Sequence, residues 1–175
     1  MVTTADNSRK SGPGKSGPGQ SGSQSKRSAA RLATVQALYQ MKMTGVSADA
    51  VIVQFFEPDV ARQWSEINPG DFDRGLFTQL IKGVTAKRDE LDRIIGAALS
   101  ADWTVERLEI ILRCILEAGC YEITERPDVP PRVTITEYVD VAHAFYSGAE
   151  PGLVNGVLDK LARKFRDQEM AAGRG

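Results

Sequence analysis

Apolar side chains recur at steps of three and four residues along this 175-residue chain, from Ser28 almost to its end. That spacing places them on one face of an α-helix, and no stretch alternates with the period of two of a half-buried strand. Helix-ending residues divide the pattern at Gly45, Pro58, Pro69, Gly70, Pro127, Pro130, Pro131, Ser147 and Gly148. The sequence therefore predicts an all-α bundle of six or seven helices with short connections.

The individual helices follow from these apolar stripes. We expect a first helix over roughly residues 27–43, and further helices that carry the stripes 51–56, 108–123, 133–145 and 154–165. Residues 77–99 fit one long helix or two, with a break near Gly83 or in the polar run 86–90. Asp102 or Thr104 can cap the helix that follows. Residues 59–69 are ambiguous.

The first 25 residues are of low complexity. The block Ser-Gly-Pro-Gly-Lys at 11–15 returns as Ser-Gly-Pro-Gly-Gln at 16–20, with almost no apolar side chains to offset chain entropy. Gly14-Lys15-Ser16 resembles the end of a phosphate-binding loop, but Arg9 stands where that motif needs glycine. We predict a disordered basic tail over 1–25, a helical domain over 26–168 and a flexible C-terminus over 169–175.

The net charge of −1 conceals an asymmetry between the start of the chain and the rest. Residues 1–31 carry six basic side chains and one acidic side chain, whereas the remainder carries 16 basic and 22 acidic ones. A basic arm on an acidic body suggests a polyanionic partner, and a solubilising tail is the alternative.

The start of the first expected helix carries the clearest binding signal. Lys26, Arg27 and Arg31 cluster there, although the helix dipole disfavours cations at an N-terminus. Helix stability does not explain them, whereas a polyanion contact would. Further along, Gln36 suits a base edge and Tyr39 suits a stacked base, as in single-stranded RNA recognition. The alternative for Tyr39 is a core position with only its hydroxyl exposed.

Catalytic and metal-binding signals are weak. His143 is the only histidine, and Asp140 three positions earlier could orient it as a base, but a packing or surface role is favoured. Cys114 and Cys120 lie in an apolar helix and indicate buried structural thiols rather than a disulfide or reactive site. We expect no enzyme activity, metal or cofactor. Without an 18-residue apolar run or a signal peptide, we also expect a cytoplasmic protein and no membrane partner.

Four blocks resemble the NusB family of bacterial transcription antitermination factors. The segment 30–40 is similar to the family's opening helix, and Cys120-Tyr121-Glu122-Ile123 with Pro127-Asp128-Val129-Pro130 to a second block. The stretch 132–137 resembles Lys-Val-Ala-Ile-Asn-Glu of the family, and 154–160 matches its C-terminal signature. The blocks keep family order and spacing over about residues 26–166.

This resemblance implies an all-helical fold of two three-helix halves without catalytic activity. NusB-like proteins bind boxA RNA of nascent ribosomal RNA transcripts with NusE, a small-subunit ribosomal protein, and join NusA and NusG on RNA polymerase. Carried over by position, the RNA-binding residues are Lys26, Arg27, Arg31, Gln36 and Tyr39, and Arg113 matches a further basic position. Family members occur as monomers and as homodimers, and the sequence does not choose between them.

Several positions depart from the family. Ser28 and Ala29 stand where the arm is often basic, Leu153 replaces a frequent phenylalanine, and Leu112 and Glu117 replace commonly acidic and basic residues respectively. Two alternatives stay open: a protein-binding adaptor, and a detached relative of the N-terminal domain of ribosomal RNA cytosine methyltransferases, whose Gly-rich cofactor loop we do not find here.

Asn155, Gly156 and Asp159 of the C-terminal signature favour a structural role. Glycine inside a helix is about 1 kcal/mol less favourable than alanine. We therefore expect a close helix–helix approach at Gly156, with Asn155 capping or bridging a neighbouring loop.

Overall fold

The computed structural model describes residues 18–57, 59, 71–101 and 103–172, with the backbone alone for 18–21. Its helices are α1 (Pro18–Thr44), α2 (Ala48–Phe56), α4 (Arg74–Ala86), α5 (Arg88–Ala98), a 3-10 turn (Val105–Arg107), α6 (Ile110–Glu125), α7 (Pro131–Phe145), α8 (Glu150–Phe165) and α9 (Asp167–Ala172). No strand occurs in these residues, which confirms the all-α prediction.

The helices begin and end where the local chemistry requires it. Gly45 ends α1 with a positive φ of 73°, a conformation that glycine adopts without strain. Ser47 caps α2 by accepting a hydrogen bond from the Ala50 N–H at 3.2 Å. A break at Lys87 separates α4 from α5, so the two-helix alternative for residues 77–99 is the right one.

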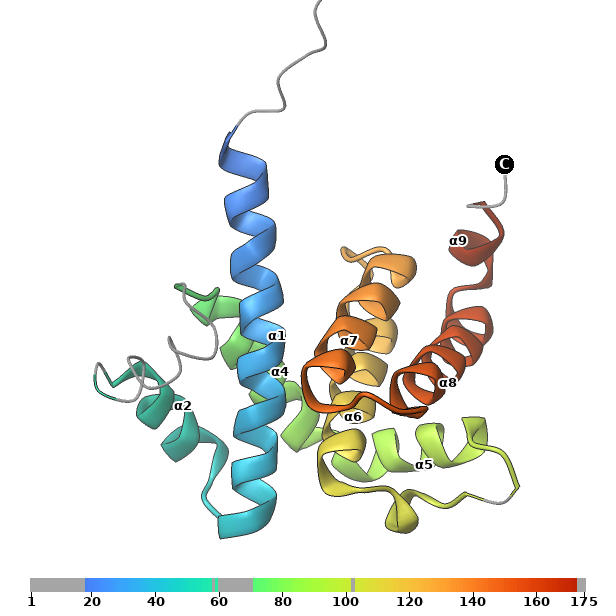
Figure 1. Cartoon of the computed structure of the whole chain (residues 1–175), viewed down its shortest axis with the longest axis horizontal. Helices are drawn as coiled ribbons and strands as arrows, with labels where there is room; N and C mark the ends of the chain where they lie inside the picture. The colour runs from blue at the N-terminus through green and yellow to red at the C-terminus, as the bar shows by residue number, and fades with distance from the viewer. Residues whose placement is uncertain (1–17, 58, 60–70, 102, 173–175) are drawn as a thin grey trace, which may run out of the picture.

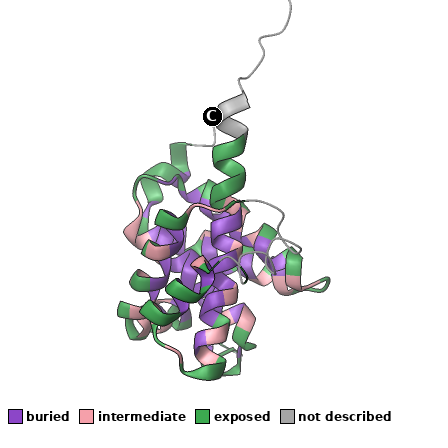
Figure 2. Cartoon of the chain, turned by 90° about the vertical axis from the view of Figure 1, so that its left-hand side faces the viewer, coloured by how far each residue is buried: buried purple, intermediate pink, exposed green. Residues whose placement is uncertain are grey.

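Two groups of helices share α6 as their common support. α1, α2 and α4 pack against one another on one side, and α7 and α8 pack against each other and α6 on the other (Figure 1). α5 contacts both α6 and α8. Fully buried side chains from both groups, including Leu38, Phe77, Ile115 and Leu158, form one continuous core, which Figure 2 shows in purple.

Both ends of the domain differ from the prediction. α1 begins at Pro18, so residues 18–25 are helical rather than part of a disordered tail, and the exposed residues 22–25 stand above the body (Figure 2). At the other end, α9 occupies 167–172, where a flexible terminus was expected from 169. Met170 is buried, and its carbonyl accepts a hydrogen bond from Arg132 Nη2 at 2.7 Å.

The expected close approach at Gly156 is wrong. Gly156 and Asn155 are exposed on α8, and a Cβ on Gly156 would meet nothing within 4 Å. Close approaches lie instead at Gly83 on α4, where a Cβ would overlap the Tyr121 ring, and at Gly119 on α6, where a Cβ would come within 2.8 Å of Leu158 Cδ1. Asp159 pairs with Arg163 one turn along the same helix, at 2.6 Å.

None of the helices in the described ranges is both long enough and apolar enough to span a bilayer.

Candidate nucleic-acid interface

The two exposed cations at the start of α1 are each paired with an acid from the segment before α4. Lys26 Nζ lies 2.9 Å from Asp71 Oδ2, and Arg27 Nε lies 4.0 Å from Asp73 Oδ2. Asp73 also caps α4, because its Oδ1 accepts a hydrogen bond from the Leu76 N–H at 2.9 Å. The basic pair is therefore accessible to solvent but already has carboxylate partners.

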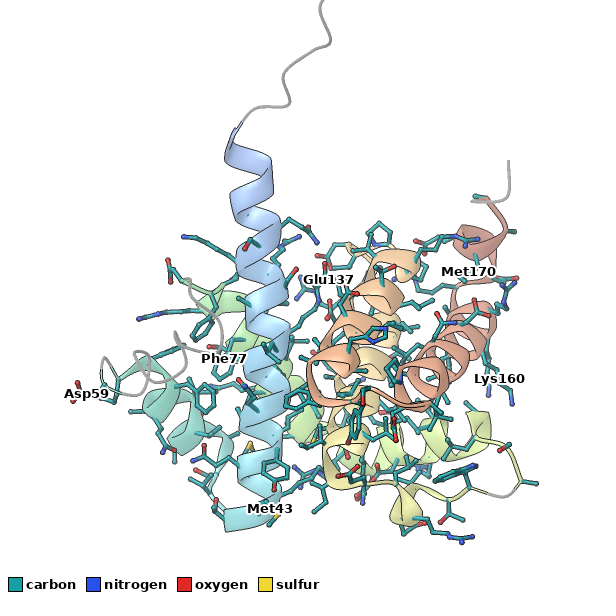
Figure 3. All side chains as sticks on the ribbon, in the orientation of Figure 1. Met43, Asp59, Phe77, Glu137, Lys160 and Met170 are labelled. Atoms are coloured by element: carbon teal, nitrogen blue, oxygen red, sulfur yellow. The ribbon has the colours of Figure 1, made fainter. Side chains whose placement is uncertain are left out.

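Arg31 is not at the surface, and this corrects its assignment as a phosphate contact. Its side chain is 1% exposed, and its Nε and Nη2 donate hydrogen bonds to both carboxylate oxygens of Glu122 on α6, at 2.8 and 2.9 Å. Its Nη1 lies 3.2 Å from Glu137 Oε2 on α7, a residue that Figure 3 shows facing α1. A planar guanidinium suits such a two-sided pair. Arg31 therefore joins α1 to α6 and α7.

The electrostatics around Arg31 are those of one buried cation held by two carboxylates. Burial alone would lower the pKa of Arg31, but the hydrogen bonds and charge of Glu122 raise it. Tyr138, fully buried beside the cluster, has its pKa raised by burial and by the Glu122 charge. Arg31 therefore stays a cation in the core, held by the Glu122 carboxylate.

Gln36 and Tyr39 lie together on the wall of an apolar groove between α1, α6 and α7. The groove encloses about 430 Å³ and is lined by Val35, Gln36, Tyr39, Gln40, Met43, Thr44, Ile111 and Phe145. Tyr39 is 37% exposed and Met43 56%, so both reach solvent at the rim. Tyr39 is thus neither a core residue nor a fully exposed one. Its position suits a flat aromatic ligand such as a base.

Arg113 belongs to a different, partly buried cluster. Its Nη2 is hydrogen-bonded to Asp92 of α5, and its Nε donates to Glu117 Oε1 at 3.1 Å. Lys42 of α1 donates to the same Glu117 oxygen at 2.8 Å. Burial raises the pKa of Glu117, against the lowering effect of Lys42. The cluster ties α1 to α5 and α6 and leaves 27% of the Arg113 side chain exposed.

The candidate catalytic groups do not converge. Cys114 and Cys120 are free, buried thiols, and burial raises the pKa of each to about 12, which confirms the structural interpretation. His143 is exposed on α7. Within the described residues, no group of three or more histidine, cysteine or acidic side chains is arranged to hold a metal ion.

Comparison with known families now decides the class of protein. The model of the NusB family matches residues 28–163, which is most of the chain. The chain belongs to the NusB family. The transcription antitermination protein NusB of Rhodospirillum rubrum is 44% identical over 92% of this chain and 96% of that protein. The protein of the same name from Nitrobacter hamburgensis is 43% identical over 84% of this chain and 92% of its own length.

Solved NusB structures share the fold. T. maritima NusB matches with a TM-score of 0.69 and 22% identity, covering 83% of this chain and 96% of that one. A chain in the crystal structure of antitermination factors NusB and NusE in complex with double-stranded RNA matches with a TM-score of 0.63 and 18% identity, covering 79% and 96%. These likenesses confirm the NusB-like helical fold.

Two residues that depart from the NusB family pattern, Ser28 and Leu153, have defined surroundings in the structure. Ser28 lines a small groove between α1 and α7 together with Glu137 and Asp140. Asp140 and Glu137, which also pairs with Arg31, therefore line the groove beside this serine. Leu153 is half-buried and packs against the core.

Three groups of residues around the start and the groove of α1 were not predicted from the sequence. Phe145 and Ile111 were assigned to helix stripes, and nothing in their spacing indicated that they meet Tyr39 across a groove. Glu122 lay inside a quoted NusB block, but its pairing with Arg31 spans 91 positions. The acids before α4 gave no signal, because they follow the ambiguous residues 59–69.

Proposed function

We propose that this chain is a transcription antitermination factor that binds boxA RNA of nascent ribosomal RNA transcripts together with NusE. In this role it joins NusA and NusG on RNA polymerase and opposes premature termination. The observation that carries the proposal is the groove that places Gln36 and Tyr39 beside Phe145. Membership of the NusB family, whose relatives carry the name transcription antitermination protein, supports the same function.

The groove has the chemistry of a base-binding site. Two aromatic rings and the Ile111 and Met43 side chains form its walls, and the Gln36 amide can both donate and accept a hydrogen bond. Proteins recognise single-stranded RNA by splaying out bases, stacking them on aromatic rings and hydrogen-bonding their edges. An unpaired base that enters this groove would find all three features.

The cations supply phosphate contacts at a distance from the groove. Arg27 precedes Tyr39 by twelve residues, which is about 18 Å along α1 and about a third of a turn around it. An RNA that reaches both Arg27 and the groove must therefore cross α1 obliquely. In this proposal Lys26 and Arg27 contact RNA phosphates. The exposed part of the Arg113 side chain provides a further phosphate contact.

A solved relative supports the choice of partners. The complex of antitermination factors NusB and NusE with RNA contains a chain of this fold. Because that similarity is at 18% identity, it supports NusE as the partner to test and assigns no contact residue of this chain.

A fluorescence-anisotropy titration tests the function directly. Labelled boxA RNA and a scrambled RNA of equal length are titrated with the full chain, with and without NusE. We expect tighter binding to boxA that NusE enhances. The Tyr39→Leu variant should weaken boxA binding by about 1–3 kcal/mol, the stacking contribution of one base, while keeping its apolar contacts in the groove. Equal binding of both RNAs, unaffected by NusE, would reject the proposal.

A protein-binding adaptor is the second candidate, and one observation favours it. Among the residues that the structure describes, each of the four cations expected to bind RNA has a carboxylate partner within the chain. Such a surface presents little free positive charge. NusE binding measured in a separate titration of labelled NusE, together with no boxA preference in the RNA titration, would select the adaptor.

A further inference from the structure

The ion pairs at the start of α1 hold acids where RNA phosphates would have to bind. Lys26 and Asp71 have side chains that are 53% and 69% exposed, and Arg27 and Asp73 are 44% and 37% exposed. These pairs therefore lie in solvent and not in the core. The Asp73 N–H also donates a hydrogen bond to the Lys26 carbonyl at 3.1 Å, which holds the segment before α4 against α1.

Carboxylate and phosphate compete for the same donors. Both present charged oxygens that accept hydrogen bonds from ammonium and guanidinium groups. The hydrogen bond and charge of Lys26 lower the pKa of Asp71, so this carboxylate is ionised at neutral pH. Asp128 lies near enough for the charge of Arg27 to help Arg126 lower its pKa to about 2. An approaching phosphate therefore meets an anionic neighbour as well as a cation.

We propose that Asp71 and Asp73 are intramolecular competitors that RNA phosphates must displace from Lys26 and Arg27. This inference rests on the proposed RNA-binding role of α1. The competitors weaken the contacts that any RNA backbone can make, whereas the groove at Tyr39 lies at the other end of α1 and is unaffected. Recognition then depends more on bases and less on charge.

The size of the effect follows from the exposure of the pairs. Exposed ion pairs are weak, so removing either carboxylate should tighten RNA binding by roughly two- to five-fold. The gain should shrink at high ionic strength, because salt screens charges in solvent. Asp73→Asn is a suitable substitution because asparagine caps helices as well as aspartate does.

A matched control separates competition from a general change of charge. Asp49 of α2 pairs with Lys82 at 3.3 Å, and both side chains are exposed. Asp49→Asn therefore removes one carboxylate and one exposed ion pair away from Lys26. The background variant Lys26→Gln gives a second control, since Asp71 can compete only where Lys26 keeps its charge.

The experiment is an anisotropy titration of the full chain with boxA and scrambled RNA at low and high salt, with a thermal melt of each variant. We expect Asp71→Asn and Asp73→Asn to tighten binding of both RNAs two- to five-fold at low salt, and Asp49→Asn to change it less than two-fold. In the Lys26→Gln background, Asp71→Asn should have no more effect than Asp49→Asn.

Two results would overturn the competition. One is that Asp71→Asn and Asp73→Asn bind RNA no more tightly than Asp49→Asn, whether or not their melting temperatures fall. The ion pairs would then only hold α4 against α1. The other is an Asp71→Asn gain that persists without the Lys26 charge. If the gain requires Lys26 but the wild-type protein shows no boxA preference, the competition holds and the proposed function fails.

Discussion

A guanidinium enclosed by two carboxylates is stable only while every member of the cluster is present. Arg31→Ala would leave Glu122, which is fully buried, without its bidentate partner. Breaking one side of a buried pair typically lowers the free energy of unfolding by about 3–5 kcal/mol. We expect a loss of that size in urea denaturation. Arg27→Ala is the control, and its exposed pair should contribute less than about 1 kcal/mol. Similar losses for both variants would contradict the buried role of Arg31.

Arg31 shows why the roles of single residues were harder to predict from the sequence than the helices. Lys26, Arg27 and Arg31 look equivalent in the sequence, because a cluster of basic side chains does not reveal which face of the helix is covered. The burial of Arg31 depends on α6 and α7, whose Glu122 and Glu137 lie far along the chain. Gln36 and Tyr39 were predicted to lie at one site, and the structure places them on one groove.

Asp128 gives a residue-level prediction about pH. Hydrogen bonds from Arg126 lower its pKa to about 2, below the ordinary value of 3.8. A carboxylate with a lowered folded-state pKa stabilises the fold above its unfolded pKa and loses that effect as the pH falls. The stability difference between wild type and Asp128→Asn should therefore be constant above about pH 5, shrink as the pH falls, and vanish only below about pH 2. Urea midpoints across this range test it, and a difference that grows on acidification would contradict it.

At the scale of the helices, we expect alanine substitution of two glycines, on the neighbouring helices α6 and α8, to change stability in opposite directions. Gly119→Ala places a methyl group 2.8 Å from Leu158 Cδ1 and 3.3 Å from Tyr138 Cδ2, so these buried side chains must shift. Such overpacking typically lowers the free energy of unfolding by about 1–3 kcal/mol. Gly156→Ala meets open space and should raise it by about 0.5–1 kcal/mol. Denaturant midpoints distinguish these signs, and a stabilising Gly119→Ala would refute the close approach.

The helices themselves were largely predictable, because apolar residues on the buried face of a helix recur in the sequence with a period of 3.6. The break at Lys87, the end at Gly45 and the cap at Ser47 also follow from local chemistry. The first turns of α1 and all of α9 were missed. Residues 18–25 lack an apolar stripe, and α9 is a six-residue helix that Met170 anchors to the rest of the molecule.

At the scale of the whole molecule, the positive charge of the arm is offset wherever the structure describes it. Acids before α4 pair with Lys26 and Arg27, and acids of α6 and α7 surround Arg31. The groove at Tyr39 lies towards the other end of α1, where Figure 3 labels Met43. The proposed base-binding groove and the proposed phosphate contacts are thus separated along one helix, so each can be altered without the other.

This separation predicts a modest salt dependence of RNA binding. Each phosphate contact to single-stranded RNA contributes about −0.7 to the slope of log affinity against log salt. Two contacts at Lys26 and Arg27 therefore give about −1.4, and a third at Arg113 gives about −2.1. Three further contacts from Arg9, Lys10 and Lys15 would bring the slope to about −4.2. The double variant Lys26→Gln, Arg27→Gln should make the slope less steep by about 1.4, measured by anisotropy over a series of salt concentrations. Lys82→Gln, which removes an exposed cation of α4, should leave it unchanged. If the double variant keeps the wild-type slope, RNA phosphates do not bind at the start of α1, and the groove must recognise RNA without that contact.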